Sequence, residues 1–230
     1  PDVVRIRFNG SPVDAVLIGS GDRTNPNAID VNNRFYMIRD LAVGAYSTAR
    51  PTPAECADEE VSDFRCGLPL TNNSLFNISN NRLVTGTEEE RLTALASLRS
   101  ANGWRLNLTN EGEKSLSKSL TLNGKVFLTT FTPSSVLDDI NVCEPVSGTG
   151  RLYVVDLFTG DRNVIPLGPI IPDTPSVHFG EDGQIRLLLP PGTPRGDTDG
   201  DGDDNCEGGV CDINTPLRAP YGDHWFQEEY

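Results

Sequence analysis

The sequence predicts a mainly β fold, and three observations support that prediction. Short runs rich in β-branched and aromatic residues recur along the 230 residues, and most of them end at Gly, Asn, Asp or Pro. The composition is rich in turn formers, with 22 Gly and 17 Pro. A single stretch has the apolar spacing of an amphipathic helix. This combination is typical of strands joined by turns.

The predicted strands follow one another along most of the chain. They are the runs at 3–8, 14–21, 33–44, 103–108, 118–133, 150–160 and 183–192. In the run at 118–133, Asn123 and Gly124 separate two strand-like halves, which predicts a tight hairpin. The helix is expected at about 87–102, where Thr87 and Glu90 form a capping-box pattern and Gly103 marks the end.

Two segments repeat one pattern, and this repeat predicts the architecture. Residues 33–44 (NRFYMIRDLAVG) and 150–160 (GRLYVVDLFTG) share an aromatic residue, two apolar residues, a nearby Asp, Leu and Gly. In the second segment Asp156 is expected to start a tight turn after a buried strand, with Gly160 supplying a positive φ. A strand that ends in D-x-x-T-G and is followed by a further hairpin is typical of a propeller blade. We therefore expect a partial β-propeller of about three four-stranded antiparallel blades, with one short helical insertion and long loops.

The charge of the chain limits its partners. A formal net charge of −14 argues against nucleic acid, because a phosphate backbone is bound by Lys and Arg. The same charge argues against an anionic membrane surface, and no apolar run has the length of a membrane span. The chain begins at Pro1 without Met or a leader, so we expect a processed piece of a longer protein.

The five cysteines favour disulfides over a metal. Cys56 and Cys66 lie close together in the sequence, as do Cys206 and Cys211. Neither pair has C-x-x-C spacing or an adjacent His, which makes zinc the weaker interpretation. We expect Cys56–Cys66 and Cys206–Cys211 bonds formed in an oxidising compartment, and the partner of Cys143 is left open.

Residues 195–211 (RGDTDGDGDDNCEGGVC) form an acidic run broken by glycines, and this run is the main candidate site. Alternating acidic residues, with a glycine at the sixth position from Asp197, are typical of a loop that coils around calcium. Gly208 stands where such loops usually carry a bidentate Glu, and a solvated acidic loop is the alternative. The predicted ligands are Asp197, Asp199, Asp201, Asp203 (through its carbonyl) and Asn205.

Other motifs are weaker. Arg195-Gly196-Asp197 spells the integrin-recognition tripeptide, which chance explains more simply. Residues 21–33 (GDRTNPNAIDVNN) gather Asp and Asn side chains, which suggests either a second oxygen-ligand site or a set of Asx turns. The two histidines, His178 and His224, are isolated, and no nucleophile, zinc-protease or phosphate-loop motif occurs, so we expect no enzyme activity.

Three stretches carry a resemblance to a known family. They are VLIGSGDR…VNNRFYMIRD (16–40), GWRLNL…GEKSLSKSLTLNGKVFLTTFTPSS (103–135) and C…GTGRLYVVDLFTG (143–160). In this order, over about residues 13–192, they resemble the C-terminal β-propeller of the PilY/PilC family of type IV pilus biogenesis factors and tip adhesins. Residues 1–192 would then be the C-terminal portion of a PilY-type propeller, and 193–230 the calcium-binding loop and tail. Because three blades are too few to close a ring, the other blades are expected upstream of Pro1.

The resemblance implies a non-enzymatic, calcium-binding module at the bacterial cell surface. Such a module would act in pilus assembly, surface adhesion and twitching motility. Its expected partners are the minor pilins of a type IV pilus, the upstream part of the same protein, and a host or abiotic surface. The alternative is a secreted propeller oxidoreductase of the quinoprotein type, which the D-x-x-T-G turn permits. A chain with two Trp, of which only Trp104 has a blade-like position, fits that alternative poorly.

Overall fold

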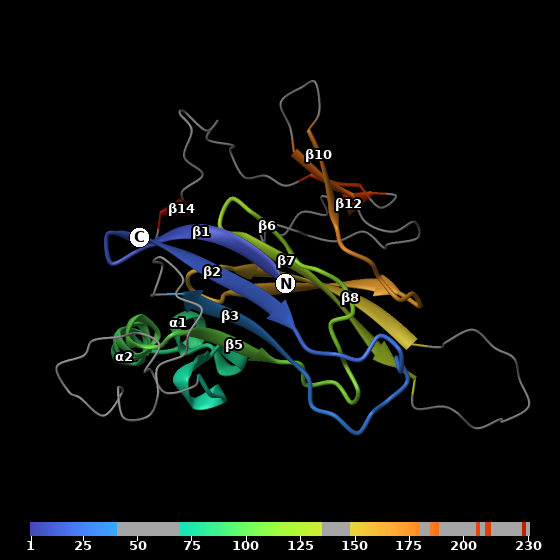
Figure 1. Ribbon diagram of the computed structural model, residues 1–230, viewed down its shortest axis with the longest axis horizontal. Helices are drawn as coiled ribbons and strands as arrows, with labels where there is room; N and C mark the ends of the chain where they lie inside the picture. The colour runs from blue at the N-terminus through green and yellow to red at the C-terminus, as the bar shows by residue number, and fades with distance from the viewer. Residues whose placement is uncertain are drawn as a thin grey trace, which may run out of the picture.

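The computed structural model describes residues 1–40, 70–134, 148–179, 185–188, 206–207, 210–212 and 227–228. Their strands form three sheets, here called sheets A, B and C (Figure 1). The prediction of a mainly β protein is confirmed. Within the described ranges the sheets close into neither a barrel nor a propeller ring.

Sheet A is formed mainly by strands from the first 40 residues of the chain. Its four central strands follow chain order and are antiparallel, and β1 and β2 are joined at Asn9 and Gly10, which both have positive φ. A short parallel strand lies at each edge. In spatial order the strands are β14 (Gln227–Glu228), β1 (Asp2–Phe8), β2 (Ser11–Gly19), β3 (Arg34–Asp40), β5 (Gly103–Asn107) and β4 (Phe76–Asn77).

Sheet B is a four-stranded antiparallel meander in chain order. The predicted Asn-Gly hairpin is confirmed, because Leu122 pairs with Lys125 and the two turn residues have φ of 48° and 73°. The fourth strand was not predicted, since Pro166 interrupts its pattern. Its strands are β6 (Leu120–Leu122), β7 (Lys125–Pro133), β8 (Gly148–Asp156) and β9 (Arg162–Gly168).

Sheet C takes its strands from both sides of the predicted boundary at 192/193. In spatial order they are β10 (Ser176–Phe179), β11 (Ile185–Leu188), β13 (Val210–Asp212) and β12 (Cys206–Glu207), all antiparallel. Segments of 193–230 therefore pair with strands of 1–192, both here and where β14 pairs with β1. The two-part division of the chain stays a prediction.

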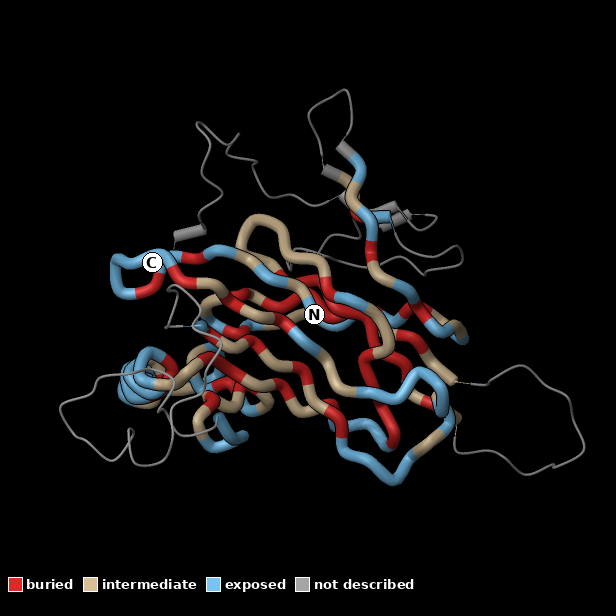
Figure 2. Tube along the Cα trace, viewed as in Figure 1, coloured by how far each residue is buried: buried red, intermediate tan, exposed pale blue. Residues whose placement is uncertain are grey.

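The hydrophobic core lies between the stacked sheets. One cluster of buried apolar side chains joins sheet A to one face of sheet B, with Trp104 and Phe35 among its largest members. A second cluster, which includes Phe127, Leu152 and Leu187, joins the other face of sheet B to sheet C. Both faces of β7 and β8 are consequently buried, as the red stretches of Figure 2 show. Sheet B is the middle layer of the molecule.

The helical insertion lies between β3 and β5 in the chain. It contains α1 (Arg82–Thr85) and α2 (Glu88–Ser100), preceded by the 3₁₀ turns η3 (Asn72–Ser74) and η4 (Ile78–Asn80). The predicted capping box is confirmed: the amide of Glu90 donates to the Thr87 hydroxyl, and the amide of Thr87 donates to the Glu90 carboxylate. That helix ends at Ser100, and Gly103 begins β5 instead of ending the helix. No helix in the described part of the chain is long and apolar enough to cross a membrane.

Candidate functional site

The predicted calcium ligands fall outside the described residues. This applies to Asp197, Asp199, Asp201, Asp203 and Asn205, and also to Arg195, Gly196, Cys56, Cys66 and Cys143. The calcium site and the Cys56–Cys66 bond therefore stay predictions. Among the residues that the structure does describe, no group of three or more His, Cys, Asp or Glu could hold a metal ion.

The hairpin that follows the acidic loop is described in its backbone. Cys206 in β12 is the direct cross-strand partner of Cys211 in β13, and Glu207 is the partner of Val210. Opposed residues of antiparallel strands have Cα atoms about 4.5–5.5 Å apart, which lies within the range that a disulfide spans. The register thus supports the predicted Cys206–Cys211 bond, which peptide mapping without reduction would test.

The D-x-x-T-G turn after β8 has the geometry that the sequence predicts. The Asp156 carboxylate accepts hydrogen bonds from the amides of Phe158 (3.1 Å) and Thr159 (2.8 Å) and from the Thr159 hydroxyl (2.9 Å). The Gly160 amide donates to the Asp156 carbonyl, and Gly160 has a φ of +70°. A Cβ at Gly160 would lie 2.5 Å from the side chain of buried Ile78. This glycine is required both for its φ and for the close approach of η4.

This turn fastens sheet A to sheet B. The indole N–H of Trp104, a fully buried residue of β5, donates to the carbonyl of Leu157 at 2.8 Å. The Leu157 amide in turn donates to the carbonyl of Gly124 in the Asn-Gly hairpin at 2.7 Å. The ring of Trp104 packs against Phe35, with 6.1 Å between the ring centroids. Trp104 therefore links β5 to the turn after β8, and Leu157 links that turn to the Asn-Gly hairpin.

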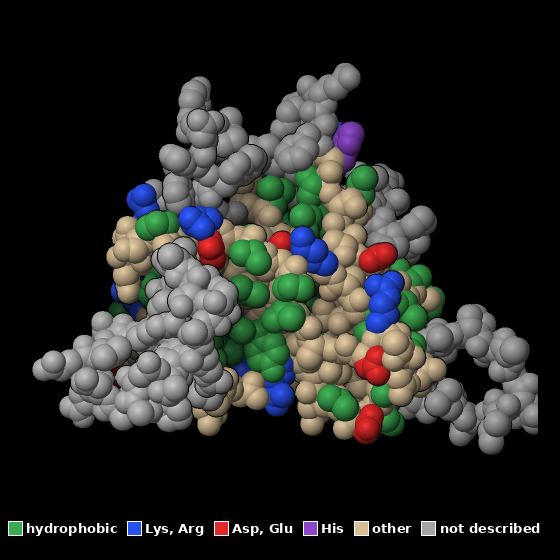
Figure 3. Space-filling view, viewed as in Figure 1, with side chains coloured by type: hydrophobic (Ala, Val, Ile, Leu, Met, Phe, Trp, Pro, Cys, Tyr) green, Lys and Arg blue, Asp and Glu red, His purple; other side chains and the backbone are tan. Residues whose placement is uncertain are grey.

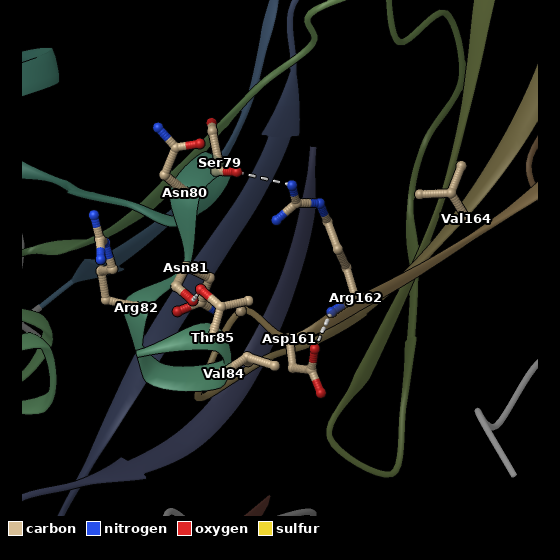
Figure 4. Close-up of a pocket in the computed structure, with 10 residues that line it drawn as sticks. Ser79, Asn80, Asn81, Arg82, Val84, Thr85, Asp161, Arg162 and Val164 are labelled. Carbon is tan, nitrogen blue, oxygen red and sulfur yellow. Dashed lines mark hydrogen bonds between the residues drawn. The ribbon is translucent and has the colours of Figure 1, made fainter. Parts of the chain in front are cut away.

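The same turn also holds the segment before the helices. The Asn81 amide group donates to the carbonyl of Thr159, and the guanidinium of Arg162 donates to the carbonyls of Ile78 (2.7 Å) and Ser79 (2.9 Å). In Figure 4 Arg162 reaches across from β9 toward Ser79. The helical insertion is thus fixed to sheet B by polar contacts as well as by the burial of Ile78.

A recess of about 520 Å³ opens where these elements meet (Figure 4). One wall comes from Ser79 to Thr85 and the other from Gly160 to Val164. Its charged groups are already engaged, because Arg82 pairs with Glu90 and the Asp161 carboxylate accepts from the Arg162 amide. The lining residues offer hydrogen-bonding groups but no nucleophile aligned with a base.

The Asx-rich loop at 21–33 wraps around an internal ammonium group. Lys114 is 2% exposed, and its Nζ donates to the carbonyls of Pro26 (2.7 Å) and Ala28 (2.5 Å). Asp22 forms the expected turn by accepting from the amide and the hydroxyl of Thr24. Because the Asp22 carboxylate is used in this turn, the structure favours the turn interpretation for that residue.

Burial lowers the pKa of Lys114, and the carboxylates of Asp22 and Asp30 partly counter that shift. In the same loop, hydrogen bonds from Thr24 lower the pKa of Asp22. An ammonium group that makes two carbonyl contacts and faces two carboxylates can stabilise the loop as a bound cation would.

A buried carboxylate lies next to Lys114 in the chain. Glu113 is 1% exposed and accepts hydrogen bonds from Thr130 (2.6 Å), Tyr153 (2.8 Å) and the amide group of Asn110 (2.6 Å). Burial raises the pKa of the Tyr153 hydroxyl above its usual value, and the adjacent Glu113 adds to that shift. The cluster ties the turn before β6 to β7 and β8, and its burial gives it a structural role.

Sequence reasoning missed both Glu113 and Lys114. They occur in a polar segment between two predicted strands, where charged residues normally face water. His178 is an exposed residue of β10 and lies opposite Arg186 of β11. His224 is outside the described residues.

Comparisons with known proteins found no match for this chain among family models, curated proteins or solved structures.

Proposed function

We propose that this chain is part of a PilY/PilC-type β-propeller that acts, without enzymatic activity, at the bacterial cell surface in type IV pilus assembly, adhesion and twitching motility. The observation that carries the proposal is the bond between Trp104 and Leu157 across two stacked antiparallel sheets. A propeller is a ring of such sheets packed face to face, each locked to the next. The family itself is supported by the sequence resemblance.

The order of the strands supports the propeller part of the proposal. Sheet B is a four-stranded meander in chain order, and the central four strands of sheet A have the same order. The two repeated segments of the sequence occupy equivalent places, since β3 is the third strand of the one meander and β8 the third of the other. A repeated unit in a repeated position is the arrangement of propeller blades.

The exposed face of sheet A gives the upstream part of the protein a place to pack. We call the face of sheet A that points away from sheet B its outer face. Val3 (58% exposed) and Ile18 (40% exposed) lie on it with the half-buried Val16, Tyr36 and Ile38. Hydrophobic side chains gather over the middle of sheet A in Figure 3. A preceding blade would cover the part of this apolar surface around Val3 and Val16.

Calcium binding belongs to the same proposal. The proposed ligands are Asp197, Asp199, Asp201, the carbonyl of Asp203, and Asn205, and the β12–β13 hairpin starts at the next residue. Because position 12 lacks the bidentate Glu, we expect a dissociation constant of roughly 10⁻⁵ to 10⁻³ M, the range of extracellular calcium modules. Calorimetry should detect calcium binding to the chain and none to Asp197→Ala/Asp201→Ala. Equal heats from the two proteins would mean a solvated acidic loop.

A pull-down on minor pilins tests the proposed partner. Purified chain with calcium should retain minor pilins of the same organism, and Asp197→Ala/Asp201→Ala should retain fewer. A Glu88→Ala/Glu89→Ala variant, which also removes two carboxylates, at exposed positions of α2, serves as the charge control. Retention that is absent, or equal for all three proteins, would contradict a calcium-dependent pilus partner.

The D-x-x-T-G turn also permits the quinoprotein alternative, although a chain with two Trp fits it poorly. An oxidoreductase of that type would bind a quinone near the ring axis. The absorbance spectrum of the protein isolated from its own organism separates the two functions. A quinone band would overturn the non-enzymatic proposal, and a spectrum of aromatic residues alone is expected.

A further inference from the structure

Two arginines lie side by side on the outer face of sheet A. Arg34 in β3 is opposite Asn107 in β5, and Tyr36 is opposite Arg105, so Arg34 and Arg105 are diagonal neighbours on one face. Both are half-buried. Residues in this relation reach each other when their side chains are long.

Both guanidinium groups use the same neutral acceptor. The Asn107 side-chain oxygen accepts from Nε of Arg34 (3.2 Å) and from Nη1 of Arg105 (2.7 Å). The Nε of Arg105 donates to the carbonyl of Asn72 at 3.0 Å, in an exposed position. These contacts hold the two cations together and leave Nη groups of both arginines for a ligand.

Neither arginine has a carboxylate partner within the described parts of the chain. Arg5, on the same face, provides the contrast, because its guanidinium holds the Asp14 carboxylate through two bonds of 2.5 and 2.8 Å. A matching acceptor for Arg34 and Arg105 is therefore absent from the described residues.

We propose that Arg34 and Arg105 form a binding site for a carboxylate of an acidic polypeptide segment. Two guanidinium forks fixed by a shared acceptor match the two oxygens of a carboxylate. The neighbouring apolar side chains of Tyr36 and Ile18 offer contact to the residues beside that carboxylate. The side-chain oxygens of Asn107 and Asn72 are oriented as acceptors here, which disfavours the more highly charged phosphate.

The site can be tested on the chain with arginine-labelled protein in solution. The probes are succinate, its uncharged analogue succinamide, and the peptides acetyl-Gly-Glu-Val-Gly-amide and acetyl-Gly-Gln-Val-Gly-amide. Succinate and the Glu peptide should shift the Nε–Hε resonances of Arg34 and Arg105, with the peptide binding about tenfold more tightly. Succinamide and the Gln peptide should leave both resonances unshifted. Because the probes are small, the result does not depend on the proposed pilus function.

Three variants that each remove one positive charge separate the role of the site from the effect of net charge. Arg34→Gln and Arg105→Gln should each weaken binding of the Glu peptide about tenfold, the loss expected for one charged hydrogen bond. Arg5→Gln removes the same charge from the same face and should leave the affinity within twofold. Equal weakening in all three variants, or no shift with either carboxylate, would overturn the site. Equal affinity for succinate and the Glu peptide would overturn the polypeptide as ligand.

Discussion

The indole nitrogen of Trp104 lies 2.8 Å from the carbonyl oxygen of Leu157, and this buried hydrogen bond joins sheet A to the turn that ends β8 of sheet B. The two residues are 53 positions apart in the chain. The bond forms only if the sheets are stacked and the D-x-x-T-G turn is closed, so it reports on both. It is the contact on which the proposed blade arrangement depends.

Replacing Trp104 should therefore cost much of the stability of the fold. Trp104→Phe removes the donor to Leu157 and leaves a cavity, and we expect a loss of about 2–4 kcal/mol in the free energy of unfolding. Urea denaturation measures it. Tyr36→Phe is the control, since it removes an exposed hydroxyl contact to Asn72 and should change stability by about 0.5 kcal/mol or less. Equal effects of the two substitutions would mean that the Trp104 contact is dispensable.

The turn after β8 can be tested at its glycine. Gly160→Ala should cost more than Gly10→Ala, although the two positions have similar φ of +70° and +80°. Each alanine should lower the free energy of unfolding by about 1–2 kcal/mol, because it must adopt a left-handed backbone conformation. Only at Gly160 does the new Cβ meet Ile78, whereas nothing lies within 4 Å of it at Gly10. The same loss of thermal stability in both variants would contradict the packing of Ile78 on this turn.

Lys114 is expected to act as the internal cation of the loop at 21–33. Lys114→Met keeps the apolar stem but removes the donor to Pro26 and Ala28, and we expect a loss of about 2–4 kcal/mol. Amide exchange in residues 22–30 should accelerate as well. Lys118→Met, at a side chain that is 57% exposed, should change stability by less than about 1 kcal/mol. Unchanged exchange in Lys114→Met would contradict the cation role.

Tyr153 gives the fold a specific sensitivity to alkaline pH. Its pKa is raised in the folded protein, so the folded state keeps a proton that the unfolded state releases above about pH 10. Its contribution to stability is therefore complete below that pH and declines as the pH rises, by at most about 1.4 kcal/mol per unit. The stability advantage of wild type over Tyr153→Phe should shrink between pH 9 and 11. This comparison cancels the opposite contribution of Lys114, whose pKa is lowered. A constant difference would contradict the shift.

The local signals in the sequence predicted local structure well. The capping box at Thr87 and Glu90, the Asn123-Gly124 hairpin and the turn at Asp156 depend on neighbouring residues, and all three are confirmed. The mainly β class follows from the same short-range patterns. The prediction for the end of the helix was wrong, because Gly103 has its φ of +129° where β5 starts against Met37.

Contacts between distant segments were not predictable in the same way. Glu113 and Lys114 are charged residues in a polar segment, and only the packing of β7, β8 and the loop at 21–33 buries them. The Arg34 and Arg105 pair depends on the register between β3 and β5, which are separated by the helical insertion. Strand β9 was missed because Pro166 is tolerated at the edge of sheet B, where no partner needs its amide.

The central claim is that this chain acts in the type IV pilus. Surface piliation in the organism that produces the protein tests that claim most directly. Deleting the segment that encodes residues 1–230 should greatly reduce surface pili, counted by electron microscopy, and abolish twitching. The wild-type segment should restore both, whereas Asp197→Ala/Asp201→Ala, produced at the same level, should restore them only in part. Unchanged piliation and twitching in the deletion strain would contradict a role in the type IV pilus.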